Sequence, residues 1–176
     1  MTIPNLITIF RFMLVPVVIV AILQEYWLVA FVLFVLAGVS DGVDGYVARR
    51  FDMRSELGAF IDPLADKALL VSIFVTLAIV GVLPVLFAVV VVARDVLIVM
   101  GVLVSWLLRR PMKIAPLMIS KANTCVQIAF AALVLGALAF SFDLGAMTGP
   151  LVLLVTALTI VTAAAYLVVW LRHMTQ

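Results

Sequence analysis

The stretch DGVDGYVARRFDMRSELGAFIDPLAD, residues 41–66, decides the fold because it places acids in segments that are otherwise apolar. Four aspartates recur in it at short spacings: Asp41, Asp44, Asp62 and Asp66. The whole chain is 68% hydrophobic and only 11% charged. An ionisable side chain within a membrane segment is costly and usually marks function. Four acids this close would repel each other unless divalent cations neutralised their charge.

The apolar residues around this stretch divide into six segments, each long enough to cross a bilayer. The mean hydropathy of +1.40 exceeds that of soluble domains, and a spanning helix needs about 20 apolar residues. The predicted spans are approximately 4–23, 27–49, 56–80, 84–108, 120–140 and 150–171. The sequence therefore predicts an all-α integral membrane protein, a six-transmembrane-helix bundle in which residues 1–176 form a single domain.

Basic residues fall on one side of the predicted membrane. The loops after the first, third and fifth spans contain no Lys or Arg, whereas the second and fourth loops contain several. The positive-inside rule then places both termini and these two basic loops in the cytoplasm. We therefore expect the aspartates to line a polar cavity that faces the cytoplasm. Because no Arg- and Ser-rich presequence precedes the first span, we expect a bacterial inner membrane, with the mitochondrial inner membrane as the alternative.

The aspartate spacing suits a site shared by two helices. Asp41 and Asp44 are three residues apart and share a helix face. Asp62 and Asp66 are four apart, which is about 6 Å along a helix axis. The short connection predicts antiparallel neighbours whose acidic faces point into one cleft. Carboxylates suit Mg²⁺ or Mn²⁺, and two such ions about 4 Å apart can clamp both oxygens of a phosphoryl displacement.

Small residues and an arginine accompany the acids. Gly45 and Ala48 leave space beside the backbone, and Gly58 does so one turn before Asp62. The planar guanidinium of Arg49 can grip a diphosphate. The alternative for the small residues is helix packing, since such stripes commonly bring membrane helices together. Packing alone does not account for four acids at this spacing.

Together these residues resemble the signature of the CDP-alcohol phosphatidyltransferase family, without a departure from its pattern. The resemblance implies an enzyme that replaces CMP on a CDP-linked lipid by an incoming alcohol. Members of this family commonly form homodimers, so the resemblance also implies a homodimer. It implies that all four aspartates hold two divalent cations, Mg²⁺ or Mn²⁺, and that Asp66 is also the catalytic general base. It implies a CDP pocket with these members: Asp41, Gly45, Ala48, Arg49, Gly58 and Asp62.

Segments outside the signature bear on the acceptor. Residues 4–11 resemble the start of both phosphatidylglycerophosphate synthases and cardiolipin synthases, while 93–98 and 119–127 resemble eukaryotic-type cardiolipin synthases more closely. The glycerophosphate enzymes tend to carry Glu at the position of Asp95 and a second Lys at that of Asn123. Glycerol 3-phosphate is a dianion that favours several fixed cations, whereas phosphatidylglycerol carries one diester charge. Asn123 therefore favours the lipid acceptor.

Four residues are candidates for binding the acceptor: Arg11, Arg94, Lys121 and Asn123. Arg94 could bind the acceptor phosphate or act as a counter-ion to the aspartates. Because adjacent helical residues point in different directions, Arg94 and Asp95 need not pair with each other. The polar face that Ser120, Asn123, Thr124 and Gln127 form could face the cavity or make interhelical hydrogen bonds.

The sequence thus predicts transfer of a phosphatidyl group from CDP-diacylglycerol to phosphatidylglycerol, with release of CMP. The expected partners are these two lipids, the surrounding membrane lipids and a second copy of the chain, with no nucleic acid. The first alternative uses glycerol 3-phosphate as the acceptor. A divalent-cation transporter is the remote alternative, because acids in membrane helices also line ion pathways. That alternative predicts polar residues throughout the bilayer, whereas here the acids cluster at one side.

Overall fold

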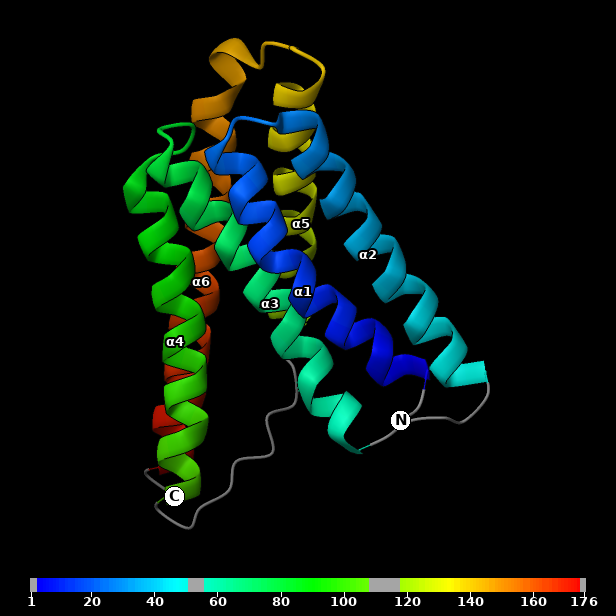
Figure 1. The fold of residues 1–176 in the computed structure, drawn as a ribbon. Helices are drawn as coiled ribbons and strands as arrows, with labels where there is room; N and C mark the ends of the chain where they lie inside the picture. Colours follow the sequence, from blue (N-terminus) through cyan, green and yellow to red (C-terminus); the bar gives the residue numbers. More distant parts are fainter. Residues whose placement is uncertain (1–2, 51–55, 108–117, 175–176) are drawn as a thin grey trace. The chain divides into compact units, whose positions relative to one another are not determined.

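The computed structural model describes the backbone of residues 3–50, 56–107 and 118–174, and the side chains of residues 10–40, 67–101, 103–105, 107 and 118–172 (Figure 1). Within these ranges every regular element is helical. The elements are α1 (Ile3–Leu23), α2 (Trp27–Arg50), α3 (Glu56–Ile79), α4 (Val85–Leu107), α5 (Met118–Ala139), the 3-10 turn η1 (Gly145–Met147) and α6 (Thr148–Met174). The all-α prediction is confirmed, and the helices begin and end within a few residues of the predicted spans.

Three helical stretches among the described residues are long and apolar enough to cross a membrane: Val85–Ser105, Met118–Ala139 and Gly145–Arg172. Shorter apolar stretches occur in α1, α2 and α3: Phe10–Leu23, Trp27–Ser40 and Lys67–Ile79. These helices are typical of a membrane protein. Six membrane spans and a cytoplasm-facing cavity stay predictions.

The chain forms two compact units. Unit 1 consists of Met1–Val82 and Ala131–Asp143, and unit 2 of Leu83–Phe130 and Leu144–Gln176. In unit 1, α1 packs against both α2 and α3. The Phe31 ring of α2 meets the Phe140 ring edge-to-face, with centroids 5.6 Å apart. Gly136 of α5 makes room for Phe31, because a Cβ at this glycine would lie 3.2 Å from the ring.

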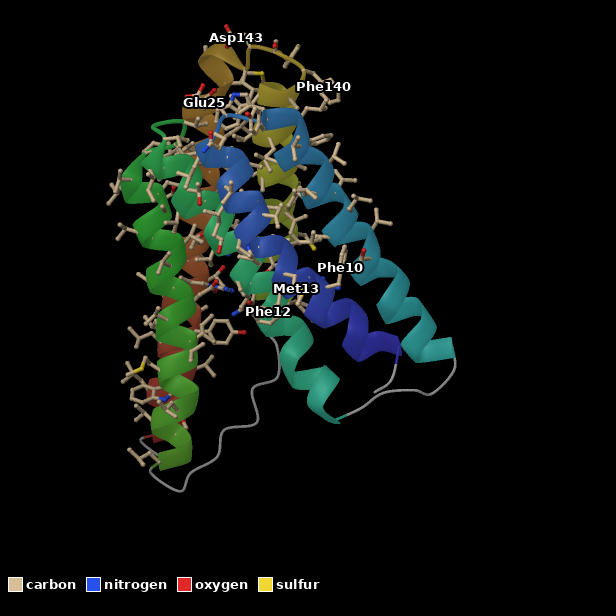
Figure 2. All side chains as sticks on the ribbon, in the orientation of Figure 1. Phe10, Phe12, Met13, Glu25, Phe140 and Asp143 are labelled. Carbon is tan, nitrogen blue, oxygen red and sulfur yellow. The ribbon has the colours of Figure 1, made fainter. Side chains whose placement is uncertain are left out.

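Three helices of unit 1 end in the same backbone conformation. Glu25, Gly81 and Ser141 have positive φ angles of 59°, 79° and 53°. The residue after each donates a backbone hydrogen bond five residues back: Tyr26 to Ala21, Val82 to Leu77, and Phe142 to Ala137. This is the Schellman motif, which satisfies the last carbonyls of a helix. Glu25 and Phe140 lie at the same end of unit 1, whereas Phe10, Phe12 and Met13 lie towards the other (Figure 2).

In unit 2, α4 packs against α6. Gly101 of α4 faces the Trp170 ring of α6, and a Cβ at this glycine would lie 3.4 Å from the ring. Phe87 and Phe130 join α4 to α5 by an edge-to-face contact with centroids 5.6 Å apart. The same three helices, α4, α5 and α6, also contribute buried polar side chains.

Candidate functional site

The aspartate motif lies on consecutive helices of unit 1. Asp41 and Asp44 belong to the last turns of α2, and Asp62 and Asp66 to the first turns of α3. The helical backbone confirms the elements predicted for both pairs and places each pair about one turn apart. Four carboxylates from two helices have the chemistry that Mg²⁺ or Mn²⁺ requires. The structure does not describe the side chains of the residues predicted to bind the metals and CDP, which are Asp41, Asp44, Gly45, Ala48, Arg49, Gly58, Asp62 and Asp66.

Arg94 is buried in unit 2, where three helices supply its surroundings. Only 3% of the residue is exposed. Its Nη1 donates to Asp95 Oδ1 and its Nη2 donates to Ser120 Oγ of α5, each at 2.5 Å. The Tyr166 ring of α6 lies 6.0 Å from the guanidinium carbon, within the range of a cation–π contact.

Sequence spacing alone does not require Arg94 and Asp95 to pair, but in the structure they do. An arginine side chain has enough rotatable bonds to fold back towards the adjacent carboxylate. Burial favours this conformation, since an isolated charge away from water is costly. Arg94 thus has a counter-ion on its own helix, and its burial does not require the aspartates of α2 and α3.

A second polar contact joins α5 to α6. Asn123 and Gln127 of α5 meet Thr159 of α6, and these three residues form what we call the polar seam. Gln127 Nε2 donates to Thr159 Oγ1 at 3.1 Å. Thr159 Oγ1 lies 3.3 Å from Asn123 Oδ1 and 2.7 Å from the Val155 carbonyl oxygen. All three side chains are buried, and Asn123 and Thr159 have no exposed surface.

The polar face predicted on α5 therefore contacts other helices. Asn123 and Gln127 bond to α6, and Ser120 bonds to Arg94 of α4. Thr124 donates to the Ser120 carbonyl on its own helix at 3.1 Å. The interhelical interpretation is confirmed for three of the four residues. It does not conflict with ligand binding, because Asn123 Nδ2 has no hydrogen-bond partner among the described residues.

The four predicted acceptor residues lie on α1, α4 and α5. Ser120 connects two of them, because it bonds to Arg94 and lies one helical turn from Asn123. Lys121 is exposed on α5. Arg11 is 1% exposed and belongs to unit 1. Binding of the acceptor by these residues stays a prediction.

Sequence reasoning missed the contribution of α6. Thr159 and Tyr166 are seven residues apart and so share a helix face, on which they meet α5 and Arg94 respectively. A signal was available, because polar residues recur every three or four positions in an otherwise apolar helix: Thr156, Thr159, Thr162 and Tyr166.

Comparison with known proteins addresses the whole chain. The family model for CDP-alcohol phosphatidyltransferase matches residues 1–172. A rat protein named cardiolipin synthase (CMP-forming) is 34% identical over 157 residues, covering 80% of this chain and 52% of the rat protein. A Schizosaccharomyces pombe cardiolipin synthase (CMP-forming)/mitochondrial hydrolase fusion protein is 32% identical over 182 residues, covering 94% of this chain and 30% of the fusion.

A chloroplastic rice protein named CDP-diacylglycerol–glycerol-3-phosphate 3-phosphatidyltransferase 1 is also similar. It is 34% identical over 146 residues, covering 73% of this chain and 44% of the rice protein. The chain thus spans about half, or less, of the length of these relatives. Because the family match extends through both units and includes the aspartate motif of α2 and α3, this chain belongs to the CDP-alcohol phosphatidyltransferase family.

Proposed function

We propose that this protein transfers a phosphatidyl group from CDP-diacylglycerol to phosphatidylglycerol, forming cardiolipin and releasing CMP. The observation that carries the proposal is the complete aspartate signature on consecutive helices α2 and α3. The family match and the similarity to the rat and fission-yeast cardiolipin synthases support it.

In this reaction Asp41, Asp44, Asp62 and Asp66 would hold two divalent cations. When bound, these would supply positive charge that neutralises the diphosphate and favours the departure of CMP. Asp66 also accepts the proton of the attacking glycerol hydroxyl. The hydroxyl oxygen forms a bond to the lipid-bearing phosphorus, and the bond from this phosphorus to the bridging oxygen of the diphosphate breaks, so that CMP leaves in one displacement.

The CDP portion of the donor is held beside these acids. Gly45, Ala48 and Gly58 leave space for the nucleotide next to the helix backbone, and Arg49 pairs with the diphosphate. Asp41 and Asp62 complete this pocket. These small residues place no bulky side chain where the ligand approaches α2 and α3.

The charges near Asn123 support a lipid acceptor. Arg94 is paired with Asp95, so the one buried guanidinium among the described residues of unit 2 has its charge balanced, and Lys121 is exposed. A phosphodiester monoanion suits such surroundings better than a phosphate dianion does. The similarity to the rice glycerol-3-phosphate enzyme keeps that acceptor as the second candidate.

The deciding experiment supplies purified protein in lipid vesicles with CDP-diacylglycerol, Mg²⁺ or Mn²⁺, and one acceptor at a time. CMP release and the mass of the lipid product are measured. We expect cardiolipin as the main product and loss of CMP release in Asp66→Asn. Dominant phosphatidylglycerophosphate formation would contradict the acceptor assignment. Cation flux without CMP release would favour the transporter instead.

We further propose that both units form one membrane domain with six spans, and that two copies associate. The uninterrupted family match over residues 1–172 supports a single domain. Labelling of single cysteines introduced at Ser141 and Arg172, in a Cys125→Ala background, tests the topology from either side of intact vesicles. We expect Arg172→Cys to react from the cytoplasmic side, and Ser141→Cys from the opposite side. We propose a bacterial inner membrane as the location, with the mitochondrial inner membrane as the alternative.

A further inference from the structure

The polar seam contains an amide that its neighbours leave partly unsatisfied. Asn123 has no exposed surface, and its Nδ2 has no hydrogen-bond partner among the described residues. A buried donor without a partner is destabilising, because it has given up its hydrogen bonds to water. Buried polar groups in native proteins are nearly always paired, so an exception requires an explanation.

Thr159 determines how this amide is oriented. Its hydroxyl accepts from Gln127 Nε2 at 3.1 Å, and its single proton is shared between Asn123 Oδ1 at 3.3 Å and the Val155 carbonyl at 2.7 Å. Because Oδ1 of Asn123 faces Thr159, Nδ2 of the same amide points away from Thr159. The seam therefore holds an N–H donor ready for an oxygen atom from elsewhere.

A balanced charge lies next to this donor. Ser120, one helical turn before Asn123, accepts from Arg94, whose Nη1 pairs with Asp95. Arg94 Nε is also buried and has no hydrogen-bond partner within the described part of the chain. The region thus offers unpaired N–H donors with little net charge. Hydroxyl and phosphodiester oxygens fit such donors, whereas a dianion would need a further cation, and Arg94 is the one buried cation among the described residues of unit 2.

We propose that Thr159 of α6 is a positioning residue for the acceptor. It orients Asn123 so that Nδ2 donates to an oxygen of a hydroxyl-rich headgroup that carries at most one negative charge. This inference rests on the proposed function and deepens it, because it assigns the choice of acceptor to an α5–α6 contact.

The test compares three variants of the full chain. Thr159→Val removes the hydroxyl with little change in shape, and Thr159→Ser keeps it. Thr162→Val is the matched control, because Thr162 is also fully buried and donates to its own helix, to Leu158, at the same 2.7 Å as Thr159 does to Val155. Among the described residues, Thr162 makes no hydrogen bond to α5.

We expect Thr159→Val to raise the KM for phosphatidylglycerol roughly three- to tenfold, the effect of one lost hydrogen bond. The KM for CDP-diacylglycerol and kcat should change less than about twofold. Thr159→Ser should restore the wild-type KM, and Thr162→Val should retain it. A general structural defect would instead move both KM values and kcat together.

A binding measurement judges the inference without turnover. Dihexanoyl phosphatidylglycerol is titrated against the melting temperature of each variant, with no CDP-diacylglycerol present. We expect Thr159→Val to need roughly three- to tenfold more of this lipid than the wild type for the same shift. Equal behaviour of Thr159→Val and Thr162→Val, or a wild type that the lipid does not stabilise, would overturn the inference. Stabilised wild-type protein that releases no CMP would defeat only the proposed transferase.

Discussion

Trp170 of α6 lies against Gly101 of α4, and its indole Nε1 is 3.0 Å from both the Gly101 carbonyl oxygen and Ser105 Oγ. Gly101 lets the indole lie close to the α4 backbone, since a Cβ there would already be 3.4 Å from the ring. Because an indole N–H away from water needs an acceptor, the donor shared by these two oxygens aligns the two helices at this position.

We expect Trp170→Phe to lower the free energy of unfolding by about 1 kcal/mol, because the ring keeps its apolar contacts but loses its N–H donor. Thermal unfolding in detergent measures the change. Trp27→Phe is the matched control, since the Trp27 indole donates no hydrogen bond to any described residue. Equal destabilisation by both changes would show that the hydrogen bond to α4 contributes nothing.

The helix end at Glu25 predicts a stabilising substitution. Glu25 has a φ of 59°, a conformation that glycine adopts without steric cost. We expect Glu25→Gly to raise the free energy of unfolding by about 0.5–1 kcal/mol. Glu25→Ala removes the same charge but keeps a Cβ, so it should give no gain. A gain of equal size in Glu25→Ala would assign the effect to charge.

Two helical glycines should respond oppositely to alanine. A Cβ at Gly38 of α2 meets nothing within 4 Å, whereas one at Gly136 of α5 lies 3.2 Å from the Phe31 ring. We expect Gly38→Ala to stabilise the protein by about 0.5–1 kcal/mol through its helix propensity. Gly136→Ala should gain less or lose stability, because Phe31 must move. The melting temperatures of the two variants test this expectation. A larger rise in melting temperature for Gly136→Ala than for Gly38→Ala would contradict the expected packing.

The pair formed by Arg94 and Asp95 predicts a change of acceptor. Asp95→Asn leaves the buried guanidinium without its counter-ion, which should destabilise the protein by roughly 3 kcal/mol. It also removes one negative charge and so leaves the charge of Arg94 unbalanced, and the ratio of glycerol 3-phosphate to phosphatidylglycerol use should rise. Competition between both acceptors in one assay gives this ratio directly. Asp95→Glu retains the charge and should leave the ratio near that of the wild type.

Removal of divalent cations should abolish CMP release, and Mg²⁺ or Mn²⁺ should restore it. Asp62→Asn should reduce activity by roughly a hundredfold or more, because a metal ligand is lost. The midpoint of thermal stabilisation by Mn²⁺ provides a measure that is independent of turnover. Asp143→Asn, at the end of unit 1 where Glu25 lies, is the control and should leave this midpoint unchanged (Figure 2). A similar shift in both variants would contradict a specific site on α2 and α3.

The sequence was sufficient to determine the helices and the family. Apolar segments of spanning length gave six helices close to their observed bounds, because hydropathy is a property of consecutive residues. The motif from Asp41 to Asp66 was also readable, since all its members lie in one continuous stretch. Its placement on the end of α2 and the start of α3 followed from the same local pattern.

Only the tertiary structure revealed which polar side chains meet. Thr159 lies 36 residues from Asn123, and no local pattern gives the rotation of α6 that brings them to 3.3 Å. The pairing of Arg94 with Asp95 depended on burial, which favoured a rotamer that sequence spacing alone does not indicate. Helix formation is decided by neighbouring residues, but contacts between helices depend on their rotation and alignment, which the packing of distant side chains sets.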